Sequence, residues 1–363
     1  MKEKIYSAVF LISLAIFILN FMLQGPISFG YSDDFGLITK LSPVFWVGYL
    51  GMIVIIYYHY TNFGDIREVF VLLTLFLVTV YLIGTPFFYE ILPRFEDSWF
   101  HSHLAEKIYE TGKVRSTGNI YEQYPGSFLF YGLSFNFLPV YTFMKMFTIL
   151  FYLFGVSVVY LIFKELDSPK TALLVTILYM FFSWTAEDNH ISPQFLMINL
   201  YIVFIFLLVK LMKTPDEWRM YGFLLLTLIL VFSFSHLFTQ IFVFSTLGAF
   251  FVLVPKTRKL ILPIFIFAIV LFVIHETVFT EIFGTFRKDL MESIRNFSLS
   301  SFLSSPSERI GTEGISRKIF IWSRLTILGT SMILGLSGIV TMYLKGSKTE
   351  AKLLLAWSYV KIL

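Results

Sequence analysis

The chain has 363 residues, of which 57% are hydrophobic and only 14% are charged, and its formal net charge is +4. Soluble domains carry about a quarter charged residues, and the core of a domain this size cannot hide so much apolar surface from water. This composition excludes an ordinary soluble protein, makes lipid the expected solvent for most of the chain, and gives no reason to expect a nucleic-acid partner. The absence of cysteine also excludes disulfides and cysteine-based metal or nucleophile sites.

The first predicted element is an apolar run at 5–23, preceded by Lys2 and Lys4. This run is longer than the hydrophobic part of a usual signal peptide, and no small-residue cleavage site follows it. We therefore interpret it as a retained first span rather than a cleaved leader.

Similar apolar runs recur to the end of the chain. A helix needs about 20 such residues to cross the hydrocarbon core of a membrane. No Gly/Ser-rich linker, fixed-period repeat or low-complexity tract divides the chain, so we predict a single transmembrane domain over 1–363. The expected fold is all-α, a polytopic helix bundle of about 10–11 spans whose long outer loops carry interfacial helices. The further predicted spans are 43–60, 68–88, 139–163, 170–186, 194–212, 219–235, 237–254, 259–275, 319–344 and, apparently truncated, 351–363.

Lysine and arginine predict the orientation, because cytoplasmic loops are enriched in these residues. With a cytoplasmic N-terminus, every inner loop is basic, whereas the short outer loops 187–193 and 235–237 contain neither residue. This alternation holds only if the segment 127–138 is re-entrant or interfacial. We thus predict a multi-pass cell-membrane protein with long outer loops at 24–42, 89–138 and 276–318. The inner cations are Arg67, Lys164, Lys170, Lys210, Lys213, Arg219, Lys256, Arg258, Lys259, Lys345, Lys348 and Lys352.

Histidines and acidic side chains gather on the predicted outer face, whereas His59 lies at the inner end of a span. Ionisable groups at membrane depth are costly and usually line a wet cavity or meet a partner. For any one of these residues a merely polar loop is a sufficient explanation, but the one-sided distribution of the set favours a site. The outer set comprises His101, His103, His190, His236, His275, Glu276 and the acidic pairs at 33–34, 96–97 and 187–188.

The most informative segment begins with the acidic pair Glu96 and Asp97. Asp97 is placed to cap the helix that follows, and His101 lies four residues later on the same helix face. Gly112 is typical of the residue after a helix C-terminus. An interfacial amphipathic helix explains the apolar residues of this segment, but it does not explain the ionisable groups at its start.

The same segment contains three short motifs. They are E-D-S-W-F-H at 96–101, I-x-x-T-G-K at 108–113 and Y-x-x-Y-P-G at 121–126. Together with the many-span layout, they resemble the first large outer loop of C-type (GT-C) glycosyltransferases, polytopic enzymes that use polyprenyl-phosphate-linked sugars. The resemblance implies that an acidic residue at the start of this loop is the catalytic base, a role that falls to Asp97 with Glu96 beside it.

The chain differs from this family in two respects. Two additional spans precede the loop, which leaves open that Asp33 and Asp34 in the first outer loop take the catalytic role instead. The W-W-D motif of the oligosaccharyltransferase type is absent, which argues against peptide glycosylation by an oligosaccharide block.

Further outer residues are candidates for contact with a sugar or a lipid phosphate. Ser192 and Pro193 predict a helix start, whose free N–H groups favour anions, although a tightly capped turn is an equal interpretation. The 276–318 segment supplies arginines that suit bidentate phosphate contact or simply meet lipid headgroups. The predicted substrate-binding residues are His101, His103, Tyr124, Asp188, His190, Gln194, His236, Arg287 and Arg295.

The resemblance implies transfer of a sugar from a polyprenyl-phosphate donor to an acceptor glycan, lipid or protein at the outer membrane face. Asp97 would take the proton of the acceptor hydroxyl as its oxygen attacks the anomeric carbon, with inversion. Membrane lipids are the other expected partners, and no cofactor is expected. A divalent metal held by Glu96, Asp97, His101 and His103 is an alternative, although histidines two residues apart suit a strand better than a helix.

The rival class is a non-enzymatic membrane protein, either a secondary transporter or a lipid flippase. Transporters usually place ionisable residues near the bilayer midplane and often contain an internal repeat. Here Lys145 is the clearest charge within a predicted span, and no repeat is evident. The phosphate-binding and nucleophile motifs of ATPases and serine hydrolases are also missing, which disfavours ATP-driven transport.

Overall fold

A computed structural model describes residues 1–27, 36–91, 93, 96–114, 120–182 and 190–278, together with isolated positions between 326 and 344. These residues form helices and no β-strand; their extended pairings are two isolated β-bridges, Ile27 with Glu90 and Phe63 with Ile66. The predicted all-α fold is therefore confirmed for this part of the chain.

Seven helices in the described part are long and apolar enough to cross a membrane, and two shorter apolar helices accompany them. They correspond one to one with the predicted spans from 5–23 to 259–275, which confirms a multi-pass membrane protein. The predicted spans 319–344 and 351–363 fall outside the described residues apart from isolated positions. The helices are α1 (Lys2–Gln24), α2 (Pro43–Thr61), α3 (Val69–Thr79) continuing through η2 (Val80–Gly84) into α4 (Thr85–Tyr89), α8 (Val140–Leu166), α9 (Pro169–Phe182), α10 (Pro193–Lys213), α11 (Trp218–Ser235), α12 (Leu237–Leu253) and α13 (Arg258–Val278).

Three further helices occupy the long loop between α4 and α8: α5 (Glu96–Thr111), α6 (Ile120–Gln123) and α7 (Gly126–Ser134). The predicted end of α5 is confirmed, because Gly112 has a φ of 61° and its N–H bonds to the Ile108 carbonyl at 2.8 Å. With nine residues, α7 is too short to cross a membrane, in agreement with the interpretation of 127–138. Short 3-10 turns lie at Gly36–Thr39, Pro215–Glu217 and Pro255–Thr257.

The chain divides into two compact units. Unit 1 comprises Met1–Lys113 and Gly126–Thr239, and unit 2 comprises Val114–Pro125 and Gln240–Leu363. The single domain expected over 1–363 stays a prediction.

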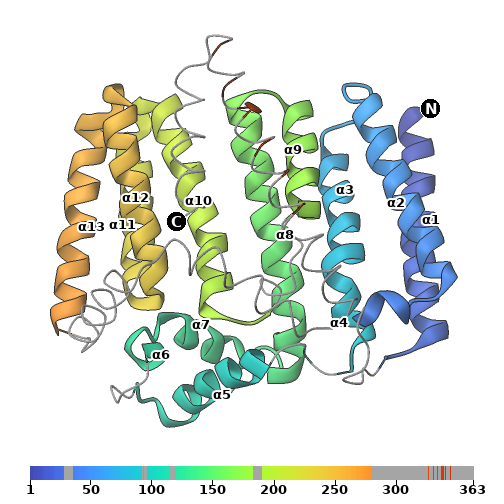
Figure 1. Ribbon diagram of the computed structural model, residues 1–363, viewed down its shortest axis with the longest axis horizontal. Helices are drawn as coiled ribbons and strands as arrows, with labels where there is room; N and C mark the ends of the chain where they lie inside the picture. Colours follow the sequence, from blue (N-terminus) through green and yellow to red (C-terminus); the bar gives the residue numbers. More distant parts are fainter. Residues whose placement is uncertain are drawn as a thin grey trace. The chain divides into compact units, whose positions relative to one another are not determined.

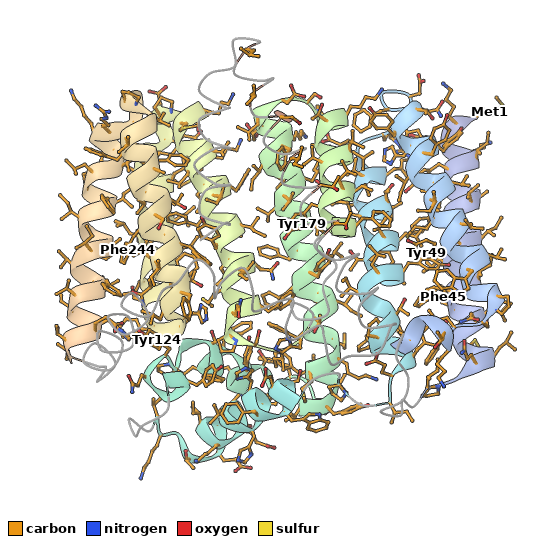
Figure 2. The ribbon with its side chains drawn as sticks, in the orientation of Figure 1. Met1, Phe45, Tyr49, Tyr124, Tyr179 and Phe244 are labelled. Atoms are coloured by element: carbon orange, nitrogen blue, oxygen red, sulfur yellow. The ribbon has the colours of Figure 1, made fainter. Side chains whose placement is uncertain are left out.

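In unit 1, α1, α2 and α3 lie side by side and pack through aromatic side chains (Figure 1). The ring of Tyr81 lies 5.0 Å from that of Phe17 and 5.4 Å from that of Phe45, which is labelled in Figure 2. The Tyr81 hydroxyl donates to the Ser13 carbonyl at 2.6 Å. A Cβ at Gly48 would collide with this hydroxyl, so α2 needs glycine where it meets Tyr81.

Ion pairs define one end of unit 1, which we term the basic end. They join the start of α1, the α2–α3 connection and the C-terminal ends of α8 and α10. Exposed ion pairs contribute roughly 0–1 kcal/mol each to stability. Their presence nevertheless shows that these segments lie close together. The predicted grouping of Arg67, Lys164 and Lys210 on one side is thus confirmed within unit 1. The pairs are Lys2–Asp65, Arg67–Glu3, Lys164–Glu68 and Lys210–Glu165.

The opposite end of unit 1, the α5 end, carries α5 and α7 packed against each other (Figure 1). The Tyr131 hydroxyl of α7 donates to the Ser192 carbonyl before α10 at 2.7 Å. Gly126, the first residue of α7, approaches the end of α11 so closely that a Cβ there would lie 2.9 Å from the Phe234 carbonyl oxygen. These contacts bring α7 against the turn before α10 and the end of α11.

Candidate functional site

Helix α5 turns a polar face inward. Ser98, His101 and Ser102 are each 2–3% exposed, and Ala105 is fully buried beside them. Leu104 is also buried, at 9%, whereas the aromatic residues Trp99 and Phe100 are 44% and 40% exposed, as expected for a helix that lies in a membrane interface. A helix whose buried face is polar needs a reason other than hydrophobic packing, because buried polar groups must find partners.

The buried face of α5 meets α7. The ring of His101 lies 5.8 Å from that of Phe128, and a Cβ on Gly132 would lie 3.0 Å from the Ala105 carbonyl oxygen. The contacts run in the same order along both helices, from His101 and Phe128 to Tyr109 and Asn136, so the two helices are parallel and Ser127 lies near the level of His101 and Ser102. The hydroxyls of Ser102 and Ser127 are buried and have no hydrogen-bond partner among the described residues.

His190 approaches the same place from the turn before α10. It is half-buried, and it lies close enough to His101 for the two imidazoles to interact electrostatically. The turn has the predicted structure, because the Ser192 hydroxyl caps α10 by accepting from the Phe195 N–H at 3.1 Å. We term the set of buried His101, Ser102 and Ser127 with half-buried His190 the polar cluster.

Burial lowers the pKa of His101 to about 4, an effect that attraction from Asp97 opposes and repulsion from His190 supports. The imidazole is therefore neutral at neutral pH and offers hydrogen bonds rather than positive charge. Asp97 is exposed at the start of the helix. Because α5 begins at Glu96, Asp97 lies within the first turn and is not the N-cap that the sequence suggested; the side chain of Glu96 is outside the described residues.

The remaining predicted ligands are placed as follows. His103 and Gln194 are exposed, on α5 and in the first turn of α10. His236 ends α11, its Nδ1 lies 2.9 Å from the Thr239 hydroxyl, and burial lowers its pKa to about 4, so it too is neutral. The predictions at Asp188, Arg287, Arg295 and the pair Asp33–Asp34 lie outside the described residues.

Unit 2 contains a second buried polar group, formed by Tyr124, His275 and Glu276. The Tyr124 hydroxyl donates to Glu276 Oε1 at 2.5 Å, and His275 Nδ1 lies 3.2 Å from the same oxygen. All three side chains are at most 4% exposed. Burial, reinforced by the hydrogen bond to Glu276 and by its charge, raises the pKa of Tyr124. The role of Tyr124 in substrate binding stays a prediction; in this structure its hydroxyl is committed to Glu276. The sequence signal for its partners was the adjacent His275 and Glu276 at the end of an apolar run.

The described residues contain no group of three or more histidine or acidic side chains arranged to hold a metal ion. On α5, His101 is buried and His103 is exposed, so the two histidines point to different sides of the helix. These two histidines do not converge on one point in this structure, and both the metal alternative and the expectation of no cofactor stay predictions.

No protein-family model matches the chain, and none of the curated proteins or solved structures matches it. The resemblance carried by the motifs of 96–126 therefore stays a prediction, and the geometry of the site has to support any function.

Proposed function

We propose that the protein transfers a sugar from a polyprenyl-phosphate-linked donor to an acceptor at the extracytoplasmic face of the cell membrane. The observation that carries this proposal is the position of Asp97. Its exposed carboxylate lies one helical turn from His101, at the edge of the polar cluster. An accessible base thus adjoins a buried face rich in neutral hydrogen-bonding groups.

The polar cluster suits a sugar better than an ion. A buried hydroxyl without a partner costs on the order of 1–3 kcal/mol, which a ligand that supplies hydrogen bonds can recover. Ser102 and Ser127 are two such hydroxyls, and the neutral imidazole of His101 adds a group that donates or accepts. An uncharged polyhydroxylated ligand matches this set.

The proposed reaction needs one base. The acceptor oxygen forms a bond to the anomeric carbon, and its proton passes to the Asp97 carboxylate. The bond between the anomeric carbon and the phosphate oxygen breaks, and its electron pair leaves with the phosphate. Because a phosphate is stable as an anion, no general acid is required, and the product has inverted configuration. Asp33 or Asp34 is the alternative base.

The orientation belongs to the same proposal. The basic end of unit 1 faces the cytoplasm under the positive-inside rule, which places the N-terminus there and the α5 end outside. A membrane-embedded donor then approaches α5 laterally.

The test is a transfer assay with the purified full chain in liposomes, given polyprenyl phosphates that carry different radiolabelled sugars and a mixture of lipid and glycan acceptors. The proposal predicts a labelled acceptor and an equal amount of released polyprenyl phosphate. Movement of labelled lipid across the bilayer without any new product would support a flippase and contradict the proposal. Asp33→Asn and Asp34→Asn, assayed in parallel, identify an alternative base.

A further inference from the structure

Lys145 is a charged residue on the membrane-spanning helix α8 that the proposed transfer reaction does not use. It lies in the second turn of the helix and is half-buried. Its ammonium donates to the backbone carbonyl of Glu90 at 2.7 Å, which brings the charge back to the level of the α4 C-terminus. Lysine side chains near the ends of spans commonly extend to the membrane boundary in this way.

The surroundings of this ammonium are aromatic. It lies 5.4 Å from the ring centre of Phe87 and 5.3 Å from that of Tyr141, both within cation–π distance. Tyr141 precedes Lys145 by one helical turn, and its hydroxyl bonds to the Ile91 carbonyl. Tyr141 and Lys145 therefore bind the consecutive carbonyls of Ile91 and Glu90, directly after α4. These two hydrogen bonds fix the position of the ammonium.

This arrangement leaves the ammonium incompletely satisfied. An ammonium has three N–H donors, and the described residues provide one hydrogen bond. The buried carboxylate of Glu90 also attracts the charge electrostatically. Aromatic faces supply attraction but no acceptor for the other two N–H groups, so an external anion completes the site.

The exposed surface near the ammonium is apolar. Ile91 is 49% exposed and Tyr141 41%. A water-soluble anion gains nothing from such a surface, whereas a lipid places its phosphate at the membrane boundary and its chains against apolar side chains.

We infer that Lys145, flanked by Phe87 and Tyr141, binds the phosphate of a membrane lipid at the α5 end of unit 1. Two lipids share this chemistry: a polyprenyl phosphate and an anionic phospholipid. The site is independent of the proposed glycosyl transfer, because it is measured as lipid binding without any reaction. An absence of lipid binding at Lys145 and an absence of sugar transfer are therefore separate results.

The test is native mass spectrometry of the detergent-solubilised full chain with four separate probes: polyprenyl monophosphate, the corresponding polyprenol, phosphatidylglycerol and inorganic phosphate. The wild-type protein is expected to retain polyprenyl phosphate or phosphatidylglycerol, or both, and to bind polyprenol about tenfold or more weakly than polyprenyl phosphate. Comparison of the two phosphate lipids shows which of them supplies the bound phosphate. Comparison of polyprenyl phosphate with polyprenol tests the role of the phosphate without any change to the protein.

Lys145→Gln is expected to weaken lipid-phosphate binding by about tenfold to a hundredfold, and Lys145→Arg to retain it. Glu90→Gln, which removes the competing carboxylate, should bind at least as tightly as wild type. Lys113→Gln changes an exposed lysine of α5's C-terminal flank and should have no effect. Equal binding of polyprenol and polyprenyl phosphate, unchanged lipid binding in Lys145→Gln, or binding of inorganic phosphate in place of both lipids would each overturn the inference.

Discussion

Asp97 and His101 lie one turn apart on α5 with opposite environments: the carboxylate is exposed, whereas the imidazole is 3% exposed. Burial outweighs the attraction of Asp97 and keeps the pKa of His101 near 4, so the imidazole is neutral at neutral pH. This pairing of an accessible base with a neutral hydrogen-bonding face underlies the proposed reaction, and it also has measurable consequences for stability.

The first consequence is a pH-dependent stability. In the unfolded chain a histidine titrates near its ordinary value of 6.5, whereas folded His101 titrates at about 4. The unfolded state therefore binds more protons in this interval, and folding should lose up to about 3 kcal/mol as the pH falls through it. Thermal unfolding followed by tryptophan fluorescence should show this loss of stability in the wild type. The loss should be smaller in His101→Gln, and in the exposed-site control His103→Gln it should equal that of the wild type. An equal dependence of the unfolding temperature on pH in all three proteins would contradict the assignment of this effect to His101.

The buried hydroxyls of Ser102 and Ser127 give a second prediction. Each of Ser102→Ala and Ser127→Ala removes a group that has no partner among the described residues, so the unfolding temperature should stay the same or rise. If these hydroxyls bind the donor sugar, KM for the donor should rise about twofold to tenfold.

A matched control for these variants is Ser233→Ala on α11. The Ser233 hydroxyl is buried and donates to the Ile229 carbonyl at 2.9 Å. Its loss should leave KM unchanged. A similar KM in the two cluster variants and the wild type would show that the hydroxyls do not contact the donor.

The close approach of α7 to α11 predicts the effect of a single methyl group. A Cβ at Gly126 would lie 2.9 Å from the Phe234 carbonyl oxygen, so Gly126→Ala forces the backbone apart and should destabilise the protein by about 1–3 kcal/mol. Gly222→Ala in α11 is the control, because a Cβ there meets nothing within 4 Å. Its higher helix propensity should make it neutral or stabilising by up to about 1 kcal/mol. Unfolding temperatures of the two variants provide the measurement, and equal values would contradict this packing.

The hydrogen bond between Tyr124 and Glu276 makes a prediction within unit 2. Tyr124→Phe leaves a buried carboxylate oxygen without this donor and should cost about 1–3 kcal/mol of stability. Tyr109→Phe also removes a tyrosine hydroxyl bond, to Asn136, but on an exposed surface, and should change stability by less than about 0.5 kcal/mol. A negligible effect of Tyr124→Phe on thermal unfolding would contradict the contact.

Local features of this protein were predictable from its sequence because they depend on neighbouring residues. Uninterrupted apolar runs predicted the helices up to α13, Ser192 predicted the start of α10, and Gly112 predicted the end of α5. The predicted N-cap of α5 at Asp97 was wrong, because the helix already includes both Glu96 and Asp97.

The composition of the site was less predictable. The proximity of His101 to His190, and of Tyr124 to Glu276, depends on tertiary packing that leaves no periodic signal in the sequence. Ser102 and Ser127 looked like ordinary polar residues of an interfacial helix and of a short segment. Only the packing of α5 against the parallel helix α7 reveals that their hydroxyls are buried.

The most direct test of the central claim compares Asp97→Asn with Glu106→Gln, a change of another carboxylate on α5, in the liposome transfer assay. Asp97 is exposed, so its replacement should leave the unfolding temperature unchanged. We predict that Asp97→Asn lowers kcat by about a hundredfold to ten-thousandfold, whereas Glu106→Gln retains wild-type activity. Wild-type rates in Asp97→Asn, with activity lost in Asp33→Asn or Asp34→Asn instead, would contradict the assignment of Asp97 as the base.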